Sequence, residues 1–246
     1  MCAGRFGIAV EQGWASVDDL VANSVQNPRQ CTLNAKMQNV LTMSGTSVDM
    51  SHPTFSYDAL GTECLNTLND YLHECNPEGL STPAWKDKYW QSVLGLEHTE
   101  WKSLIPIFGQ NLGCGCSAST SCRDLARIAQ LWLNEGAWPG HGQVINRKFA
   151  IDGWRQTIKT PGTGFPAGNE YGYTMWLDVK DPIDPGIAHM EGLDAQCGYW
   201  SKEHEAIVIS FGDGDSFEPG CPPSWVLSRE AVVSSDHPLY NKTSAN

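Results

Sequence analysis

Apolar residues recur with a helical period through the first two-thirds of the chain. The longest such run covers residues 58–74, and shorter runs cover 34–42, 84–94 and 123–134. An apolar side chain every three or four positions predicts an amphipathic helix that buries one face. The stripe of the longest predicted helix consists of Leu60, Cys64, Leu65, Leu68, Tyr71 and Leu72.

Residues that favour helix ends flank several of these runs. Pro83 precedes the 84–94 segment, where its missing N–H does least harm. Ser121 is placed to cap the 123–134 helix, with Asp124 three residues on and Gly136 after its end. Near the start, the apolar run 6–10 leads into Gly13, which indicates the end of a helix. We expect the first turns of that helix to lie before Met1.

The last third of the chain has the pattern of strands. Segments 171–177, 197–200 and 206–211 are rich in aromatic and β-branched residues and predict an antiparallel meander. Residues 224–233 are expected to form one closing helix. Helices followed by strands predict an α+β fold, an antiparallel sheet flanked by helices plus a helical region. We expect one domain over residues 1–234 and a polar tail over 235–246.

Composition and charge exclude some functions. The 246 residues carry a net charge of −12, and an acidic surface repels phosphate backbones, so nucleic acid is not an expected partner. No apolar run approaches the roughly 18 residues of a membrane span. The expected partner of an active protein is a small-molecule or peptide substrate. No motif calls for a cofactor.

Nine cysteines are many for a reducing compartment. Cys114, Cys116 and Cys122 suggest a metal knuckle, but they form no Cys-x-x-Cys pair and have no histidine at ligand spacing. Disulfides or buried thiols are the preferred interpretation. The cysteines, with the sequon at Asn241, favour an extracytoplasmic or secreted protein. No signal segment precedes the first helix, so the compartment stays open.

Seven short motifs, in order between about residues 4 and 212, resemble the class C β-lactamase-related hydrolases, which include penicillin-binding proteins, esterases and amide hydrolases. The strongest is Ser121-Cys-Arg-Asp-Leu-Ala-Arg-Ile-Ala-Gln-Leu-Trp-Leu-Asn-Glu-Gly136, similar to "TARDLARFGQLLLNGG". The others are Gly7–Gly13 with Val17–Val21, Val40–Gly45, Phe55–Tyr57 with Leu60-Gly61, Leu94–Trp101, Tyr171–Trp176 and Gly192–Gln196. The resemblance implies a β-lactamase/transpeptidase-like fold, incomplete at its N-terminus.

The resemblance also implies acyl transfer to a serine. A serine hydroxyl needs a base within hydrogen-bond reach, and Ser-x-x-Lys on a helix places an amine one turn away. None of the nine lysines has a serine three residues before it. In the family this motif opens the helix that ends here at Gly13, so its place falls upstream of Met1. Truncation and true loss of the motif are both open, and truncation is the simpler explanation.

The second family element, Tyr-x-Asn, reads here Tyr57-Asp58-Ala59. Tyr57 keeps a phenol that could relay a proton, although an aromatic residue at a helix start could equally be a packing residue. Ala59 cannot supply an amide to orient a substrate. This departure weakens the expectation of β-lactam hydrolysis in particular.

The third element, Lys-Thr-Gly or His-x-Gly on a strand, has no clean match. His189 is the better positional candidate, near an oxyanion or substrate carboxylate, although its spacing to Gly192 is one residue too long. An ordinary surface histidine is the competing interpretation. Lys159-Thr160-Pro161-Gly162 precedes the first strand and is interpreted as a loop, and His141 as part of a structural turn.

Two functions therefore remain. The first is a β-lactamase-related serine hydrolase of an ester, amide or peptide, with Tyr57 and His189 as candidate catalytic residues and the nucleophile outside this sequence. The second is an inactive relative that keeps the fold as a binding or scaffold protein. The ten tryptophans could stack on sugars, but most fall where the resemblance needs core aromatics.

Overall fold

The structure is a computed structural model, and it describes residues 2–26, 28–101, 114, 118–160, 170–178, 187–192, 196–202 and 204–211. The chain divides into two compact units. The first unit contains Met1–Lys159 and Tyr171–Thr174, and the second contains Thr160–Glu170 and Met175–Asn246. The expected closing helix at 224–233, the tail at 235–246 and the sequon lie outside the described residues.

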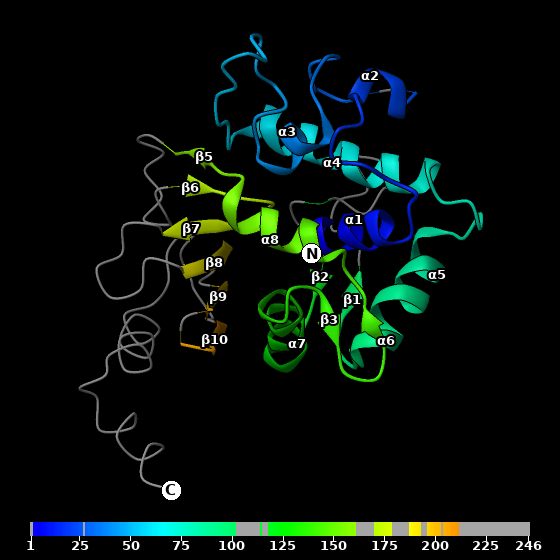
Figure 1. The fold of residues 1–246 in the computed structure, drawn as a ribbon, viewed down its shortest axis with the longest axis vertical. Coiled ribbons are helices and arrows are strands. Elements are labelled where there is room, and N and C mark those ends of the chain that lie inside the picture. Colours follow the sequence, from blue (N-terminus) through cyan, green and yellow to red (C-terminus); the bar gives the residue numbers. More distant parts are fainter. Residues whose placement is uncertain are drawn as a thin grey trace, which may run out of the picture. The chain divides into compact units, whose positions relative to one another are not determined.

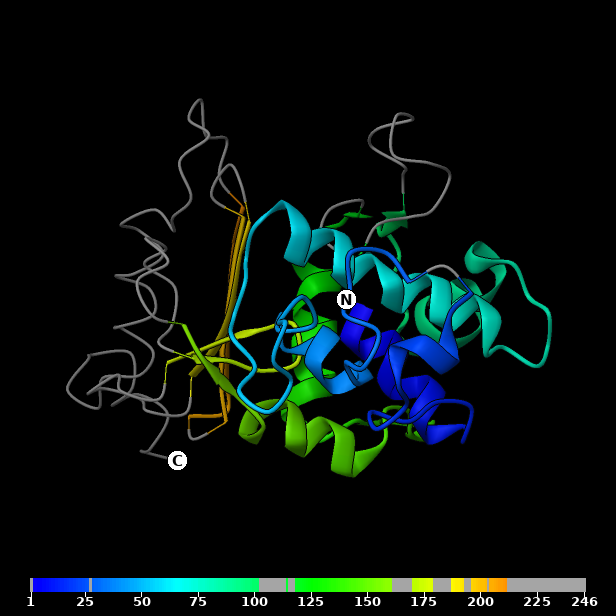
Figure 2. The ribbon, with the colours of Figure 1, turned by 90° about the horizontal axis from the view of Figure 1, so that it is seen from above.

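Helix α1 (Cys2–Glu11) is the central element of the first unit (Figure 1). Its residues 2–9 are all buried, which confirms a helix that ends before Gly13. The ring of Phe6 stacks on Tyr71 at 5.6 Å and on Phe149 at 5.7 Å between centroids. These contacts pack α1 against α4 (Ala59–Glu74) and α8 (Arg147–Arg155). Figure 2 shows α1, in dark blue, beside α4, in cyan.

The predicted helices of the first unit are present. Helix α3 (Met37–Leu41) occupies part of the 34–42 segment, and α4 follows its predicted range to within one residue. One position differs, because Leu60 is 55% exposed and does not join the buried stripe of α4. The 84–94 segment is a continuous helical stretch of α5 (Thr82–Lys86), a π-helical turn η1 (Asp87–Gln91) and α6 (Ser92–Leu94). Pro83 therefore lies within the first turn and not before it.

Helix α7 (Cys122–Leu133) confirms the strongest prediction from the sequence. The Ser121 hydroxyl accepts a hydrogen bond from the Asp124 N–H at 3.2 Å, so Ser121 is the cap. In a capping box the Asp124 carboxylate would accept a hydrogen bond from the Ser121 N–H. Here it accepts hydrogen bonds from the 97–99 loop instead. The short elements of this unit are α2 (Val21–Ser24), β1 (Glu100–Trp101), β2 (Ala118–Ser119), β3 (Ala137–Trp138), β4 (Gly142–Gln143) and β5 (Ile158–Lys159).

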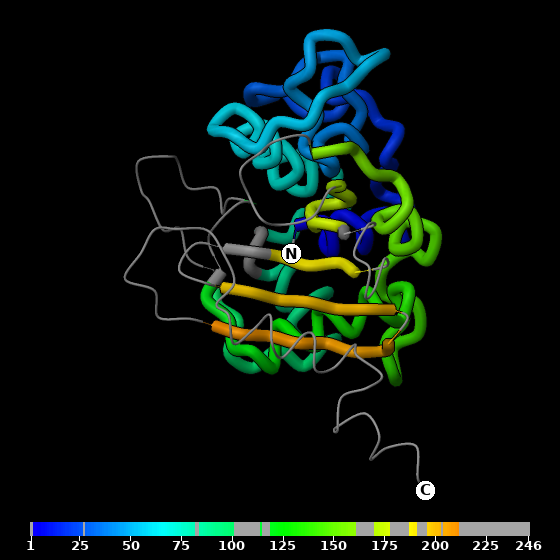
Figure 3. The backbone as a smooth tube through the Cα atoms, turned by 90° about the vertical axis from the view of Figure 1, so that its left-hand side faces the viewer, coloured from blue at the N-terminus to red at the C-terminus, as the bar shows by residue number. Residues whose placement is uncertain are grey.

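The second unit contains an antiparallel meander of four strands, β7 (Trp176–Asp178), β8 (Ile187–Gly192), β9 (Gln196–Ser201) and β10 (Ala206–Phe211). Figure 3 shows β8, β9 and β10 side by side, in yellow to orange. Ile187, Cys197 and Tyr199 form its buried centre, with Val208 packed against them. Strand β10 has exactly its predicted range, and β9 extends its prediction by one residue at each end. Strand β8 was not predicted.

The predicted strand 171–177 is broken into β6 (Glu170–Tyr171) and β7. Thr174 lies between them in the left-handed region, at φ 55°, which is incompatible with a continuous strand. Its N–H donates to the Leu41 carbonyl at 2.9 Å, so a contact within the first unit interrupts the strand. The loop interpretation of Lys159 is also wrong, because Lys159 is the last residue of β5, while Pro161 and Gly162 lie outside the described residues.

Disulfides account for several of the cysteines. Cys2 on α1 is bonded to Cys114, and Cys31 is bonded to Cys64 on α4. Cys197 is also disulfide-bonded, whereas Cys75 and Cys122 are free. Because its sulfur is bonded to Cys2, Cys114 is not available as a metal thiolate, and the disulfide interpretation is confirmed for it. None of the helices that the structure describes is both long and apolar enough to cross a bilayer.

Candidate functional site

Tyr57 lies directly before the first turn of α4, and that turn fixes its position. Asp58 is the N-cap, and its carboxylate accepts a hydrogen bond from the Gly61 N–H at 2.8 Å. This bond, followed by one from the Ser56 side chain, holds the pKa of Asp58 below its ordinary value. A Cβ on Gly61 would lie 2.0 Å from the Ser56 carbonyl oxygen. Only glycine therefore lets the 56–58 segment approach the helix so closely.

Two aromatic rings, those of Phe55 and Tyr171, contact the Tyr57 ring. The Tyr57 ring stacks on Phe55 with centroids 6.2 Å apart, and it meets Tyr171 edge-on at 6.2 Å. Phe55 and Tyr171 are 5.2 Å apart. We call Phe55, Tyr57 and Tyr171 the ring cluster. Edge and offset contacts at these distances are favourable, so the ring cluster orients the Tyr57 side chain without burying it.

The two phenols of the ring cluster differ in exposure. Tyr57 is 40% exposed, whereas Tyr171 is 4% exposed. Burial, and then the neighbouring Tyr57, raise the pKa of Tyr171 well above its ordinary value. Tyr171 therefore stays neutral at physiological pH. The phenol that can exchange a proton with a bound molecule is that of Tyr57.

Ala59 occupies the first residue of α4. Its methyl group cannot donate or accept a hydrogen bond, so the side chain at this position orients no polar substrate group. Ala59, which replaces the Asn of the Tyr-x-Asn motif, is thus exposed at the start of the helix, two positions after Tyr57 in the sequence.

His189 lies at the third position of β8, in the second unit. It pairs with Trp176 on β7 and Tyr199 on β9 and is 6% exposed. The surface-histidine interpretation is therefore wrong. Tyr57 belongs to the first unit and His189 to the second. Lys159 is exposed at the end of β5, and His141 is exposed in the turn between β3 and β4.

Comparison with solved structures decides the fold. A β-lactamase from Mycobacterium bovis superimposes with a TM-score of 0.61 and 14% identity, over 95% of this chain and 81% of its own. An octameric penicillin-binding protein homologue from Pyrococcus abyssi gives a TM-score of 0.69 and 15% identity, over 96% of this chain and 64% of its own. Simvastatin synthase from Aspergillus terreus gives a TM-score of 0.66 and 10% identity, over 100% of this chain and 82% of its own.

The chain has the β-lactamase and penicillin-binding-protein fold. The predicted fold class and the predicted resemblance are both confirmed at this level. No family model matches the sequence, and no curated protein does. At 10–15% identity the likeness establishes the arrangement of helices and strands, and the chemistry has to be argued from the residues.

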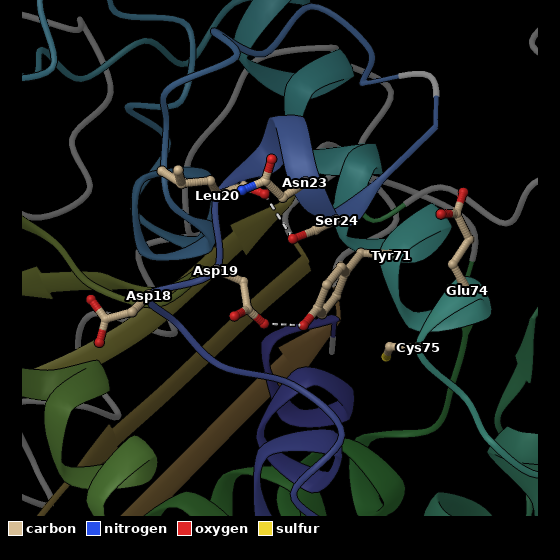
Figure 4. Close-up of a pocket in the computed structure, with 8 residues that line it drawn as sticks. All are labelled: Asp18, Asp19, Leu20, Asn23, Ser24, Tyr71, Glu74 and Cys75. Atoms are coloured by element: carbon tan, nitrogen blue, oxygen red, sulfur yellow. Dashed lines mark hydrogen bonds between the residues drawn. The ribbon is translucent and has the colours of Figure 1, made fainter.

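A separate cavity of about 650 Å³ lies in the first unit of this β-lactamase-like fold (Figure 4). It is lined by Asp18, Asp19, Leu20, Asn23, Ser24, Tyr71, Glu74 and Cys75. Figure 4 shows Tyr71 and Asp19 pointing toward each other, and the Tyr71 hydroxyl donates to Asp19 Oδ2 at 2.5 Å. Asp19 also accepts from the Ser16 N–H at 2.9 Å. This pair ties the 16–19 turn to α4.

Neither the Tyr71 phenol nor the Cys75 thiol of the cavity is activated as a nucleophile. Burial, and then the bond to Asp19, raise the pKa of Tyr71, and burial raises the pKa of the Cys75 thiol to about 11. Both groups are therefore protonated at neutral pH. Among the residues that the structure describes, no group of three or more His, Cys, Asp or Glu side chains is arranged to hold a metal ion. The ring cluster remains the better candidate for chemistry.

Proposed function

We propose that this chain belongs to a serine acyl hydrolase or acyltransferase that acts on an ester, amide or peptide, with Tyr57 as the proton relay. The observation that carries the proposal is the position of Tyr57. A partly exposed phenol stands at the start of α4, oriented by two other rings, in the fold of β-lactamases and penicillin-binding proteins. A positioned phenol can pass a proton to or from a reacting oxygen.

In this proposal the nucleophile is a serine paired with a lysine one helical turn away. The 246 residues contain no such pair, so both groups would come from outside these residues. The serine oxygen would bond to the substrate carbonyl carbon as its proton leaves toward the lysine and Tyr57. Tyr57 would then return a proton to the departing alcohol or amine, and water would release the acyl group.

The alternative is a binding or scaffold protein without catalytic activity. Two observations favour it: no serine stands three residues before any of the nine lysines, and Ala59 occupies the position of the substrate-orienting amide. The two functions differ in their reaction with a fluorophosphonate or penicillin-type probe. If the protein is a hydrolase, the probe should label the longest translation product that contains these residues covalently. An unlabelled product whose transcript begins at Met1 supports the binding protein.

In the longest translation product that contains these residues, replacing Tyr57 by Phe is expected to lower kcat/KM for a p-nitrophenyl ester by roughly 100-fold or more, the usual contribution of a general acid–base group. The ring and its two aromatic contacts are kept, so the free energy of unfolding should change little. The matched control is Tyr89→Phe, which removes a phenol that donates to Glu78 on the surface. Esterase activity that is equal in Tyr57→Phe and wild type would remove Tyr57 from the mechanism.

His189 is proposed as a second functional residue, close to the oxyanion or to a substrate carboxylate. It lies on an interior strand of the meander and is buried, a position from which a strand residue can be held precisely. His189→Gln is expected to lower kcat about tenfold or more. A purely structural role predicts instead a lower unfolding temperature with kcat unchanged, so both quantities are measured.

A further inference from the structure

The first turn of α4 exposes apolar side chains directly after Tyr57. Leu60 is 55% exposed, although the other apolar residues of its predicted stripe are buried. Ala59, at the position of the motif's Asn, is exposed as well. A single exposed leucine is ordinary on a protein surface, but this one lies three residues after the candidate proton relay. We call Tyr57, Ala59 and Leu60 the apolar rim.

The backbone around the apolar rim holds it in place. The Ser56 N–H donates to the Met43 carbonyl at 2.9 Å, and the Asp58 carboxylate accepts from the Gly61 N–H at 2.8 Å. The close approach of Gly61 to the Ser56 carbonyl fixes the segment on the other side. A ligand therefore does not have to order the rim when it binds, which lowers the entropy cost of binding.

The charge within the rim segment disfavours anionic ligands. Asp58 is the one charged residue among residues 55–61, and it is exposed. The N–H groups at a helix start ordinarily attract an anion, but here Asp58 already caps them. Its negative charge, one residue from Tyr57, repels a carboxylate placed beside the phenol. The rim therefore combines an apolar contact surface with a charge that acts against carboxylates.

We propose that the apolar rim binds the leaving-group side of the substrate, and that this side is a neutral, apolar alcohol or amine and not a carboxylate-bearing one. The proposal rests on the proposed acyl-transfer function, in which Tyr57 returns a proton to the departing alcohol or amine. The group that departs must then lie beside the Tyr57 phenol, and the side chains next to it are those of Ala59 and Leu60. Esters and amides of simple alkyl alcohols and amines fit this surface.

Binding is tested on the 246-residue chain, with no need for activity. Leucine methyl signals are followed by NMR at low salt while N-hexylacetamide is added. The Leu60 signals, identified by their loss in Leu60→Gln, should shift and saturate. The anionic analogue 6-acetamidohexanoate should need a concentration about threefold to fivefold higher, the effect of one nearby exposed charge. Asp58→Asn keeps a good helix cap and removes the charge, so it should bring the two concentrations together.

Leu20 is the matched control within the same spectra. It is 38% exposed, and it lines the cavity of Figure 4 together with Tyr71 and Cys75, at the C-terminal end of α4. A helix of 16 residues is about 24 Å long, so Leu20 and the apolar rim belong to opposite ends of α4. The Leu20 signals should stay in place.

Selectivity is tested on the longest translation product that contains these residues. From methyl to hexyl acetate, kcat/KM should rise by up to about fourfold for each methylene group that the rim covers. The neutral ester 4-methylpentyl acetate should be cleaved faster than 4-acetoxybutanoate, which has a similar shape and a negative charge. Leu60→Gln should flatten the rise with chain length, whereas Leu20→Gln should keep it.

The proposal is overturned if N-hexylacetamide leaves the Leu60 signals in place, or if it binds no better than 6-acetamidohexanoate. Leu60 signals that shift on dilution of the protein alone would also overturn it, because they indicate an interface between copies of the chain. An active product without a rise along the alkyl acetates refutes the proposal and leaves the acyl-transfer function standing. A product that cleaves no acetate refutes that function, and saturable N-hexylacetamide binding then still supports the ligand class of the rim.

Discussion

Replacing Asp124 by Ala is expected to destabilise the protein by about 3 kcal/mol or more, because a buried donor left without its acceptor costs about 1–3 kcal/mol. Asp124 is fully buried on the first turn of α7. Its carboxylate accepts from the His98 N–H at 2.7 Å, the Thr99 hydroxyl at 2.8 Å and the Glu97 N–H at 3.2 Å. Removing it leaves three donors of the 97–99 loop without their acceptor.

The charge of Asp124 gives the prediction a pH dependence. Burial alone would raise the pKa of this carboxyl group, but the bonds from His98, Thr99 and Glu97 outweigh burial and leave it below its ordinary value. A lowered folded-state pKa contributes stability that is present above about pH 4 and is lost as the pH falls further. Asp124→Asn, which keeps one acceptor, should cost less than Asp124→Ala.

Urea unfolding at pH 7 measures this difference, with Asp18→Ala as the control. Asp18 is largely exposed and pairs with Lys36 at 2.7 Å, and an exposed pair of this kind is worth about 0–1 kcal/mol. Equal losses from Asp18→Ala and Asp124→Ala would show that the Asp124 network does not hold the 97–99 loop to α7.

Local signals in the sequence predict the helices well because both ends and faces are marked. Helix α7 has a capping serine, a strict apolar stripe and a terminating glycine, and its range is correct to one residue. Strand β10 is likewise marked by continuous β-branched residues. In these elements local preference and tertiary packing agree, as they do in most natural folds.

Elements that depend on distant partners were missed. Strand β8 reads Ile-Ala-His-Met-Glu-Gly, which contains several good helix formers, and its pairing with β7 and β9 overrides that preference. Helix α8 contains Gly153, which is unfavourable in a helix. The Trp132 ring and the Tyr173 Cβ lie close to Gly153, so packing against distant residues outweighs that preference. Asn146 caps α8, and this signal was available in the sequence.

The candidate site was predictable only in part. The motif identifies Tyr57 as a candidate. Its partner Tyr171 is more than a hundred residues away in the sequence, and no local pattern predicts the contact between the two rings. The exposure of Leu60 was also hidden, because a leucine in the apolar stripe of a helix ordinarily indicates a buried position. A single sequence gives the type of residue at a site, whereas the long-range contacts that tune its pKa come only from the fold.

Removing the Cys31–Cys64 disulfide is expected to lower the free energy of unfolding by about 3–4 kcal/mol. The two cysteines are 33 residues apart, and the chain-entropy model assigns a loop of this length roughly that stabilisation through its effect on the unfolded chain. The bond also anchors the 31–36 segment to α4, and Tyr57 lies directly before the N-cap of that helix. Loss of the disulfide should therefore affect the candidate site as well as stability.

The paired variant Cys31→Ala with Cys64→Ala, unfolded in urea beside wild type, measures the effect, and Cys75→Ala is the control because Cys75 is free. Cys2–Cys114 closes a longer loop, with a separation of 112 residues, so its removal should cost about 1 kcal/mol more. A Cys31/Cys64 variant as stable as the Cys75 control would contradict the prediction. The reverse order of the two losses would indicate that strain or structure in the unfolded chain, and not loop length, determines the contribution of each bond.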